Sequence, residues 1–283
     1  MIRTRMTISA MCLSMAVPFG MAFADEDADL VINGELEITV RAPAPEHAEN
    51  LREITSGWVY RSTETQAFQL DDFENPGMIF VDDGIASWNT VEGENGESCA
   101  SCHGAPEELA GVSAVYPQWN DEAEEVRTLS MQINACRTEQ MGAQEWAYDK
   151  TDLLNMTALL ASVSRGTTVN VAIDGPAQST WEMGRDLYYT RNGLLELSCA
   201  NCHEDNYGNN IRADHLSQGQ INGFPTYRLK NAQLNGAQNR FRGCIRDTRA
   251  ETYAIGSPEF IALELYVMSR GNGLDVEGPS VRN

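Results

Sequence analysis

The sequence predicts an all-α protein of two tandem helical domains, preceded by an extension that has room for short strands. The motif Ser-Cys-Ala-x-Cys-His occurs twice, at residues 98–103 and 198–203. An apolar segment of helical length precedes each motif, and a second one, ending in Ser-Arg-Gly, follows it. Repetition on this scale indicates the duplication of a domain of roughly 100 residues.

This repeat divides the chain into five segments. We expect a signal peptide at 1–24, an N-terminal extension at 25–75, a first domain at 76–166, a linker at 167–179 and a second domain at 180–283.

The first segment has the features of a secretory signal peptide. Arg3 and Arg5 precede an apolar run, and Ala22-Phe23-Ala24 forms an A-x-A cleavage site. No later run is long and apolar enough to cross a bilayer. We therefore expect a soluble protein outside the cytoplasm.

The charge balance excludes two classes of partner. The 283 residues include 20 Lys and Arg against 41 Asp and Glu, which gives a formal net charge of -21. Nucleic acids and anionic lipid surfaces repel such a molecule, so neither is an expected partner. With 42% hydrophobic residues, the chain can still bury substantial cores.

The extension and the linker are less regular. Residues 36–40 alternate in polarity, which suggests a strand or two packed on the surface. The linker contains the alternating residues Val169, Val171 and Ile173, followed by the turn pair Gly175-Pro176.

Helices are expected on both sides of each motif. The preceding segments are 77–88 and 180–189, and the following ones are 153–160 and 260–268. A basic residue and a glycine end the last two, as is typical of helix C-termini.

The Cys-x-x-Cys-His motif is typical of covalent c-type haem attachment. Two thiols on one turn add to the two vinyl groups of a porphyrin, and the adjacent histidine becomes the proximal iron ligand. A redox pair would not need the histidine twice, and a zinc site would need both motifs in one place. We therefore expect two haems in two class I cytochrome c-like domains, at Cys99, Cys102 and His103 and at Cys199, Cys202 and His203.

One further cysteine follows each motif at a matching place, Cys136 in the first half and Cys244 in the second. Thiolate is a strong ligand for ferric iron, so both are candidate distal ligands. A disulfide between them or two buried inert thiols are the alternatives. Met141, Met268 and His215 are the other conceivable distal ligands.

Basic residues are concentrated around the last cysteine. Residues 228–249 contain one acid, Asp247, and six cations: Arg228, Lys230, Arg240, Arg242, Arg246 and Arg249. They could neutralise haem propionates, or they could hold a small anion beside Cys244. Arg240 precedes Cys244 by four residues, so a helix would place both on one face.

The paired motifs, the extra cysteine in each half and Asn-Arg-Phe-Arg-Gly-Cys at 239–244 together resemble the SoxA family, the dihaem subunits of periplasmic SoxAX cytochromes. The resemblance covers essentially the whole chain after the signal peptide. It implies that Cys136 and Cys244 are the axial ligands opposite His103 and His203. It also implies that Cys244 is the active-site residue, carried as a persulfide, and that Arg240 binds substrate.

The implied activity is that of an L-cysteine S-thiosulfotransferase, and the second domain would be catalytic. Such an enzyme couples thiosulfate oxidatively to a cysteine of a SoxYZ-like carrier and passes two electrons to c-type haem. A SoxX-like cytochrome subunit would form a heterodimer with the chain, and a soluble c-type cytochrome would accept electrons. The alternatives are a non-catalytic periplasmic dihaem electron carrier and a dihaem peroxidase, although a peroxidase needs an iron with an open position.

Overall fold

The structure is a computed structural model that describes residues 28–212 and 214–283. The expected signal peptide lies outside the described residues. Within the described part, no helix is long and apolar enough to cross a membrane.

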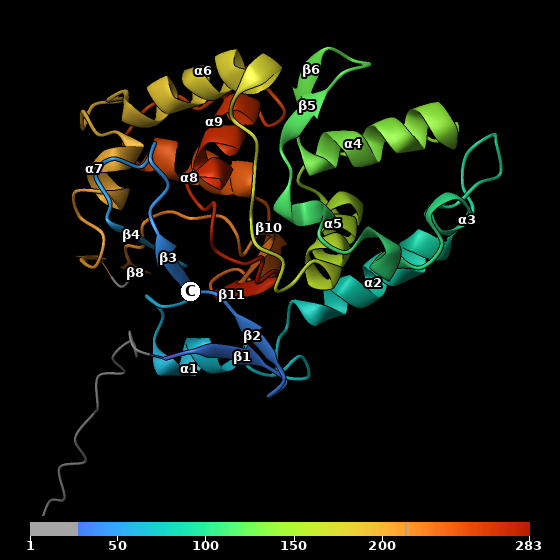
Figure 1. The fold of residues 1–283 in the computed structure, drawn as a ribbon, viewed down its shortest axis with the longest axis horizontal. Coiled ribbons are helices and arrows are strands. Elements are labelled where there is room, and N and C mark those ends of the chain that lie inside the picture. The colour runs from blue at the N-terminus through green and yellow to red at the C-terminus, as the bar shows by residue number, and fades with distance from the viewer. Residues whose placement is uncertain (1–27, 213) are drawn as a thin grey trace, which may run out of the picture.

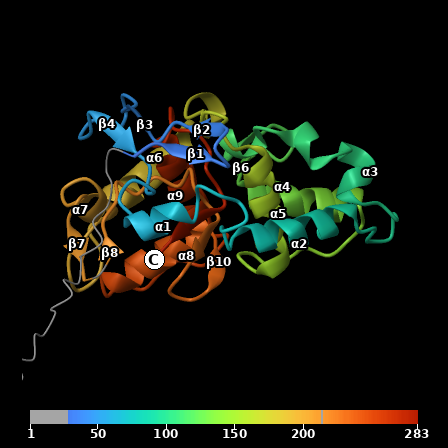
Figure 2. The same ribbon diagram turned by 90° about the horizontal axis from the view of Figure 1, so that it is seen from below.

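Two groups of helices lie side by side (Figures 1 and 2). The first group consists of α2 (Met78–Asn89), α3 (Cys99–His103), α4 (Leu129–Ala135) and α5 (Thr151–Val163). The second consists of α6 (Gln178–Tyr189), α7 (Cys199–His203), α8 (Ala237–Asp247) and α9 (Pro258–Ser269). All four helices expected around the motifs are confirmed. The fold is mostly helical, as expected, but small sheets occur between Leu30 and Arg282, so the description as all-α is incomplete.

The two groups repeat the same helix crossing. In the first, α2 packs on α5 at Gly84, where an added Cβ would lie 2.6 Å from the Asn155 carbonyl oxygen. In the second, α6 packs on α9 at Gly184, where an added Cβ would lie 2.0 Å from the Ala262 carbonyl oxygen. The glycines allow both helix pairs to approach closely, and each pair contributes most of its buried apolar side chains to one of two cores, although Ala161 of α5 belongs to the core of the second group.

The N-terminal extension forms two hairpins and a short helix. Strands β1 (Leu30–Ile32) and β2 (Leu36–Ile38) pair with each other, as do β3 (Arg41–Pro43) and β4 (Glu53–Thr55), and α1 (Thr63–Ala67) follows. The expected strands are confirmed: Ile38 and Val40 are buried while Leu36, Glu37 and Thr39 are exposed, which fits a strand packed on the surface, whereas Ile54 and Trp58 further along the extension are buried, at 0% and 1% exposure.

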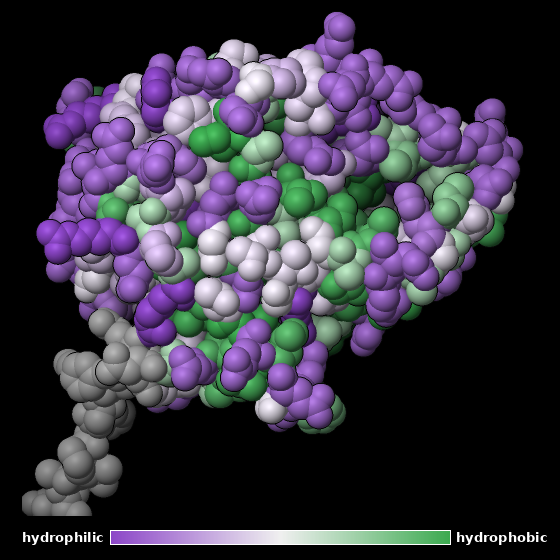
Figure 3. Space-filling view, in the orientation of Figure 1, coloured by the Kyte–Doolittle hydropathy of each residue, from purple (hydrophilic) through white to green (hydrophobic). Residues whose placement is uncertain are grey.

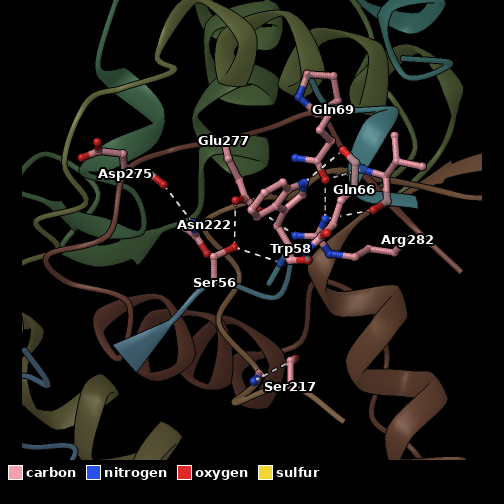
Figure 4. Close-up of polar contacts among 12 residues, drawn as sticks. Ser56, Trp58, Gln66, Gln69, Ser217, Asn222, Asp275, Glu277 and Arg282 are labelled. Carbon is pink, nitrogen blue, oxygen red and sulfur yellow. Dashed lines mark hydrogen bonds and ion pairs between the residues drawn. The ribbon is translucent and has the colours of Figure 1, made fainter. Parts of the chain in front are cut away.

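The extension is bound to the C-terminal tail (Figure 4). The Ser56 hydroxyl donates to the Glu277 carboxylate at 2.7 Å, and the Arg282 guanidinium contacts both Gln69 and Glu277. The Ser56–Glu277 and Gln69–Arg282 contacts join residues more than 200 positions apart in the sequence. The extension therefore packs against the tail that follows α9.

The segment expected as a linker is buried. The Val169 amide donates to the Leu274 carbonyl oxygen at 2.8 Å, and Thr168 pairs with Asp275 in an antiparallel bridge. Val169 and Val171 are 1% and 2% exposed. The turn η4 (Gly175–Ala177) then leads into α6.

Short strands complete the fold. Strands β5 (Gln118–Asn120) and β6 (Glu125–Arg127) form one hairpin, and β7 (Asn210–Ile211) and β8 (Asp214–His215) form another. Strand β9 (Thr226–Arg228) lies between β10 (Gln233–Asn235) and β11 (Ser280–Arg282). The pairing of β9 with β11 is parallel and sets Arg228 beside Arg282. On the face drawn in Figure 3, hydrophobic residues gather in the middle and hydrophilic residues cover the margins.

Candidate functional site: two cysteine cavities and an arginine pocket

The first motif forms the short helix α3, which begins at a capping box. The Ser98 side chain accepts from the Ser101 amide at 3.1 Å, and the Ser101 hydroxyl accepts from the Ser98 amide at 2.9 Å. This helix places Cys99, Cys102 and His103 on a cavity of about 280 Å³. Cys136 reaches the same cavity from the π-helical turn Cys136–Gln140, which continues α4.

The second motif repeats this arrangement. Ser198 and Asn201 form the capping box of α7, with backbone-to-side-chain distances of 3.0 and 3.3 Å. The motif residues and Cys244 of α8 line a cavity of about 150 Å³. The structure therefore brings together the two motif cysteines, the histidine and the extra cysteine of each half, as the sequence spacing predicts.

The donor sets of both cavities fit a covalently attached haem. Each cavity offers two thiols and a histidine within largely apolar walls. The His203 Nδ1–H donates to the Ser217 carbonyl oxygen at 2.8 Å, so Nε2 would be the ring nitrogen available to an iron.

The disulfide and zinc alternatives are not supported. All six cysteines of the described residues are free, and Cys136 and Cys244 line different cavities, so a bridge between them is excluded in this structure. Within the same part of the chain, no three His, Cys, Asp or Glu side chains are grouped as a metal site.

The other candidate distal ligands differ in position. Met141 is buried and lines the first cavity together with Cys136. Met268 belongs to the apolar core of the second group and lines a different cavity. Both ring nitrogens of His215 lie near backbone carbonyl oxygens, those of Tyr60 at 3.0 Å and Gly208 at 2.6 Å.

Cys244 differs from Cys199 in the pKa of its thiol. Burial alone raises the pKa of its thiol, but the charge of Arg240 and a hydrogen bond from His203 outweigh burial and lower that pKa to about 7. Burial raises the pKa of Cys199 to about 12, with a further contribution from Cys244. In the second cavity, the extra cysteine therefore forms a thiolate near neutral pH, and thiolate is the reactive form.

A second pocket of about 120 Å³ adjoins this cavity and shares His203, Arg240 and Cys244 with it. Four arginines from four separate segments line it, together with the carboxylate of Asp214: Arg61, Arg228, Arg240 and Arg282. We call it the arginine pocket. Burial and the charge of Arg282 are the main causes that lower the pKa of Arg61 to about 10. Such crowding of partly desolvated cations favours an anionic ligand.

The sequence pattern located only part of this pocket. Arg240 and Cys244 share helix α8, as predicted, and Arg228 lies on the neighbouring strand β9. Arg61 and Arg282 lie outside the basic segment 228–249 and were not predicted from the sequence. The other basic residues of that segment do not line the pocket.

Comparison with known proteins agrees with the geometry. Residues 83–169 match the family model described as SoxA/TsdA, cytochrome c domain. The chain is 59% identical to the L-cysteine S-thiosulfotransferase subunit SoxA of Rhodovulum sulfidophilum, over 98% of this chain and 99% of that protein. It is 52% identical to the SoxA subunit of Paracoccus pantotrophus, over 99% and 98% of the two chains.

A solved structure is also similar. The crystal structure of SoxXA from P. pantotrophus matches with a TM-score of 0.88 and 53% identity, over 91% of this chain and 99% of that one. A cytochrome c domain implies c-type haem. The chain belongs to the SoxA family of L-cysteine S-thiosulfotransferase subunits.

Proposed function

We propose that the chain couples thiosulfate oxidatively to a cysteine of a SoxYZ-like carrier protein, and that Cys244 is the reacting residue. One observation carries the proposal: Cys244 lies on the wall shared by the second cysteine cavity and the arginine pocket. The readily ionised sulfur of Cys244 thus lies between the cavity proposed to hold a haem and the arginine pocket proposed to bind an anion.

Each motif would hold one c-type haem. Cys99 and Cys102 would attach the first, with His103 and Cys136 as axial ligands. The corresponding residues at the second are Cys199, Cys202, His203 and Cys244. When bound, the second haem supplies an electron acceptor next to the reacting sulfur.

The protein's own residues position the substrate. Thiosulfate is a dianion, and Arg240 would bind it through charge-assisted hydrogen bonds, with Arg61 and Arg228 adding positive charge. The low pKa keeps Cys244 a polarizable thiolate, and it would carry additional sulfur as a persulfide. Overall, a carrier thiol and thiosulfate form one S–S bond. The reaction releases one proton, and c-type haem accepts the two electrons.

The partners follow from the proposed reaction. The similar crystal structure from P. pantotrophus is that of SoxXA, and we infer that a SoxX-like cytochrome subunit also binds this chain as a heterodimer. A soluble c-type cytochrome would take the electrons onward. These partners and the expected signal peptide are consistent with a periplasmic location.

Electron transfer without catalysis is the function favoured for the first cavity. Gln132 lines the first cavity and corresponds to Arg240 in the repeat. Each of the two residues lies four positions before the extra cysteine of its half. A neutral amide provides no charge for binding a dianion, so the first site would store or pass electrons.

Replacement of Cys244 tests the proposal, and the equivalent replacement of Cys136 is the matched control. We expect Cys244→Ser to lower thiosulfate coupling by about 100-fold or more in the haem-loaded complex. Cys136→Ser should retain most of the coupling activity. Equal activity of Cys244→Ser and the unaltered protein would rule out Cys244 as the reacting residue. Mass spectrometry of the Cys244 peptide should also detect added sulfur.

A further inference from the structure

Both ring nitrogens of His215 face atoms that can only accept a hydrogen bond. The Nδ1 atom lies 3.0 Å from the Tyr60 carbonyl oxygen, and the Nε2 atom lies 2.6 Å from the Gly208 carbonyl oxygen. A neutral imidazole has a hydrogen on one nitrogen only, so the other nitrogen would turn its lone pair toward a carbonyl oxygen. The imidazolium form, with a hydrogen on each nitrogen, satisfies both contacts.

His215 joins β8 to the N-terminal extension by reciprocal hydrogen bonds. The His215 ring donates to the carbonyl oxygen of Tyr60, and the guanidinium of the next residue, Arg61, donates to the His215 carbonyl oxygen. The rings of Tyr60 and His215 also meet edge to face, with their centroids 5.5 Å apart. These contacts, together the His215 clasp, fix the part of the extension that carries Arg61 against β8.

The His215 clasp is part of the wall of the arginine pocket. Arg61 and His215 both line that pocket, together with Cys244. Arg61 is 7% exposed, and its buried Nε–H has no hydrogen-bond partner within the described part of the chain. The clasp thus fixes a pocket cation through a backbone carbonyl oxygen and leaves one of its donors unused.

Charged groups on several elements act on the His215 ring. Asp214, its neighbour on β8, favours the imidazolium form, whereas the arginines oppose it. The two carbonyl oxygens also favour it, since loss of one ring hydrogen turns an attractive contact into a repulsive one. The ionisable groups of the other elements around the same pocket are Arg61, His203, Arg228, Arg240, Cys244 and Arg282.

We propose that His215 is a positioning residue of the arginine pocket, which as an imidazolium holds Arg61 in place and adds positive charge for the binding of a small anion. The inference rests on the proposed function, in which this pocket binds thiosulfate. As the pH rises, loss of one ring hydrogen removes a positive charge and one contact of the clasp. The pocket should therefore bind a dianion less tightly at high pH than at low pH.

His215→Gln tests the assignment, and His47→Gln is the matched control. His47 also ties the extension to the second helix group, since its Nε2 atom lies 3.1 Å from the Ser269 carbonyl oxygen, but it does not line the arginine pocket. Calorimetric titration of the haem-loaded complex with sulfate gives the Kd at pH about 5.5 and about 8, on either side of the ordinary imidazole pKa of about 6.5.

We expect the unaltered complex and His47→Gln to bind sulfate about fivefold more tightly at the lower pH. In His215→Gln this ratio should fall to about twofold or less, and sulfate should bind more weakly than in the unaltered complex at the lower pH. The variant keeps Cys244, so any share of the pH effect that comes from this thiol remains in it.

A second measurement uses the unaltered complex alone. NMR of the reduced complex with isotope-labelled histidine should show, at pH about 5.5, two ring N–H groups of His215 that exchange slowly with water, because both are hydrogen-bonded. Three results would overturn the assignment: the same pH ratio in His215→Gln as in the unaltered complex, an equal loss in His47→Gln, or the absence of either protected N–H. Thiosulfate coupling by the unaltered complex is assayed separately. Its absence would refute the proposed function, while the ring N–H groups and the sulfate constants still decide the role of His215.

Discussion

Arg240 in α8 and Gln132 in α4 hold the same place, one helical turn before the extra cysteine of their half. The Gln132 side-chain amide donates to the Cys136 sulfur at 3.5 Å. The charge of Arg240 instead helps to lower the pKa of Cys244 to about 7, against the effect of burial. The extra cysteine thus has a neutral amide one turn before it in the first half and a cation in the second, and Arg137, the cation that lines the first cavity, is paired with Glu92.

Substituting glutamine for Arg240 should remove this difference. Because the cation would contribute to binding of the dianion, Arg240→Gln is expected to raise the KM for thiosulfate by roughly 10- to 100-fold. It should also raise the pKa of Cys244. Arg240→Lys should fall between the two, since lysine keeps the charge without the planar pair of donors. Steady-state kinetics over a range of thiosulfate concentrations measures the effect, and an unchanged KM with an altered haem spectrum would favour a propionate role.

Arg61 should affect anion binding although it lies far from Cys244 in the sequence. Its guanidinium donates to the His215 carbonyl oxygen and lies in the arginine pocket. An anion that binds the folded protein raises the Tm. Sulfate should therefore raise the Tm of the unaltered protein more than chloride at equal ionic strength, and Arg61→Gln should at least halve that difference. Arg52→Gln is the control, because Arg52 is exposed in the same extension. An equal sulfate effect in both variants would exclude Arg61 from the anion site.

The sequence was sufficient for the parts of the site that depend on local spacing. The motif residues lie on one helical turn, and Arg240 and Cys244 share one helix face, so counting residues predicts both arrangements. Arg61 and Arg282 could not be found this way. The parallel pairing of β11 with β9 brings Arg282 to the pocket, and three-residue strands carry no clear alternation in sequence.

The burial of the linker and of the later part of the extension could not be predicted for a similar reason. Their burial depends on contacts with the C-terminal tail, such as the Ser56–Glu277 hydrogen bond and the Val169–Leu274 pairing. The short alternation within each segment does not show which distant part of the chain will cover it.

The helix crossing at Gly184 should be intolerant of a single methyl group. An added Cβ would lie 2.0 Å from the Ala262 carbonyl oxygen, so Gly184→Ala requires α6 and α9 to move apart. We expect it to lower the free energy of unfolding by about 1–3 kcal/mol or more. Gly243→Ala is the control: in α8 nothing lies within 4 Å of its added Cβ, and it should stabilise the protein by about 0.5–1 kcal/mol. Urea unfolding of the haem-loaded protein measures both, and a stabilising Gly184→Ala would disprove the close crossing.

Glu264 should make stability depend on pH. Its side chain and that of Asp149 line a cavity of about 110 Å³, and the Gln238 amide donates to the Glu264 carboxylate at 2.8 Å. Burial is the main cause that raises the pKa of Glu264 to about 7, and the charge of Asp149 raises it further. The carboxyl group is therefore protonated in the folded chain at pH values where the unfolded chain, with a pKa of about 4.3, has already ionised it.

Stability should consequently fall as the pH rises from about 4.5 to 7, because the folded state must give up a proton that it favours. Glu264→Gln removes this ionisation and can still accept the hydrogen bond from Gln238. Relative to the unaltered protein, it should be more stable at pH 8 than at pH 5, by about 1–3 kcal/mol. Denaturant unfolding at the two pH values measures the change. Identical pH dependence in both proteins would show that Glu264 titrates alike in the folded and unfolded chains.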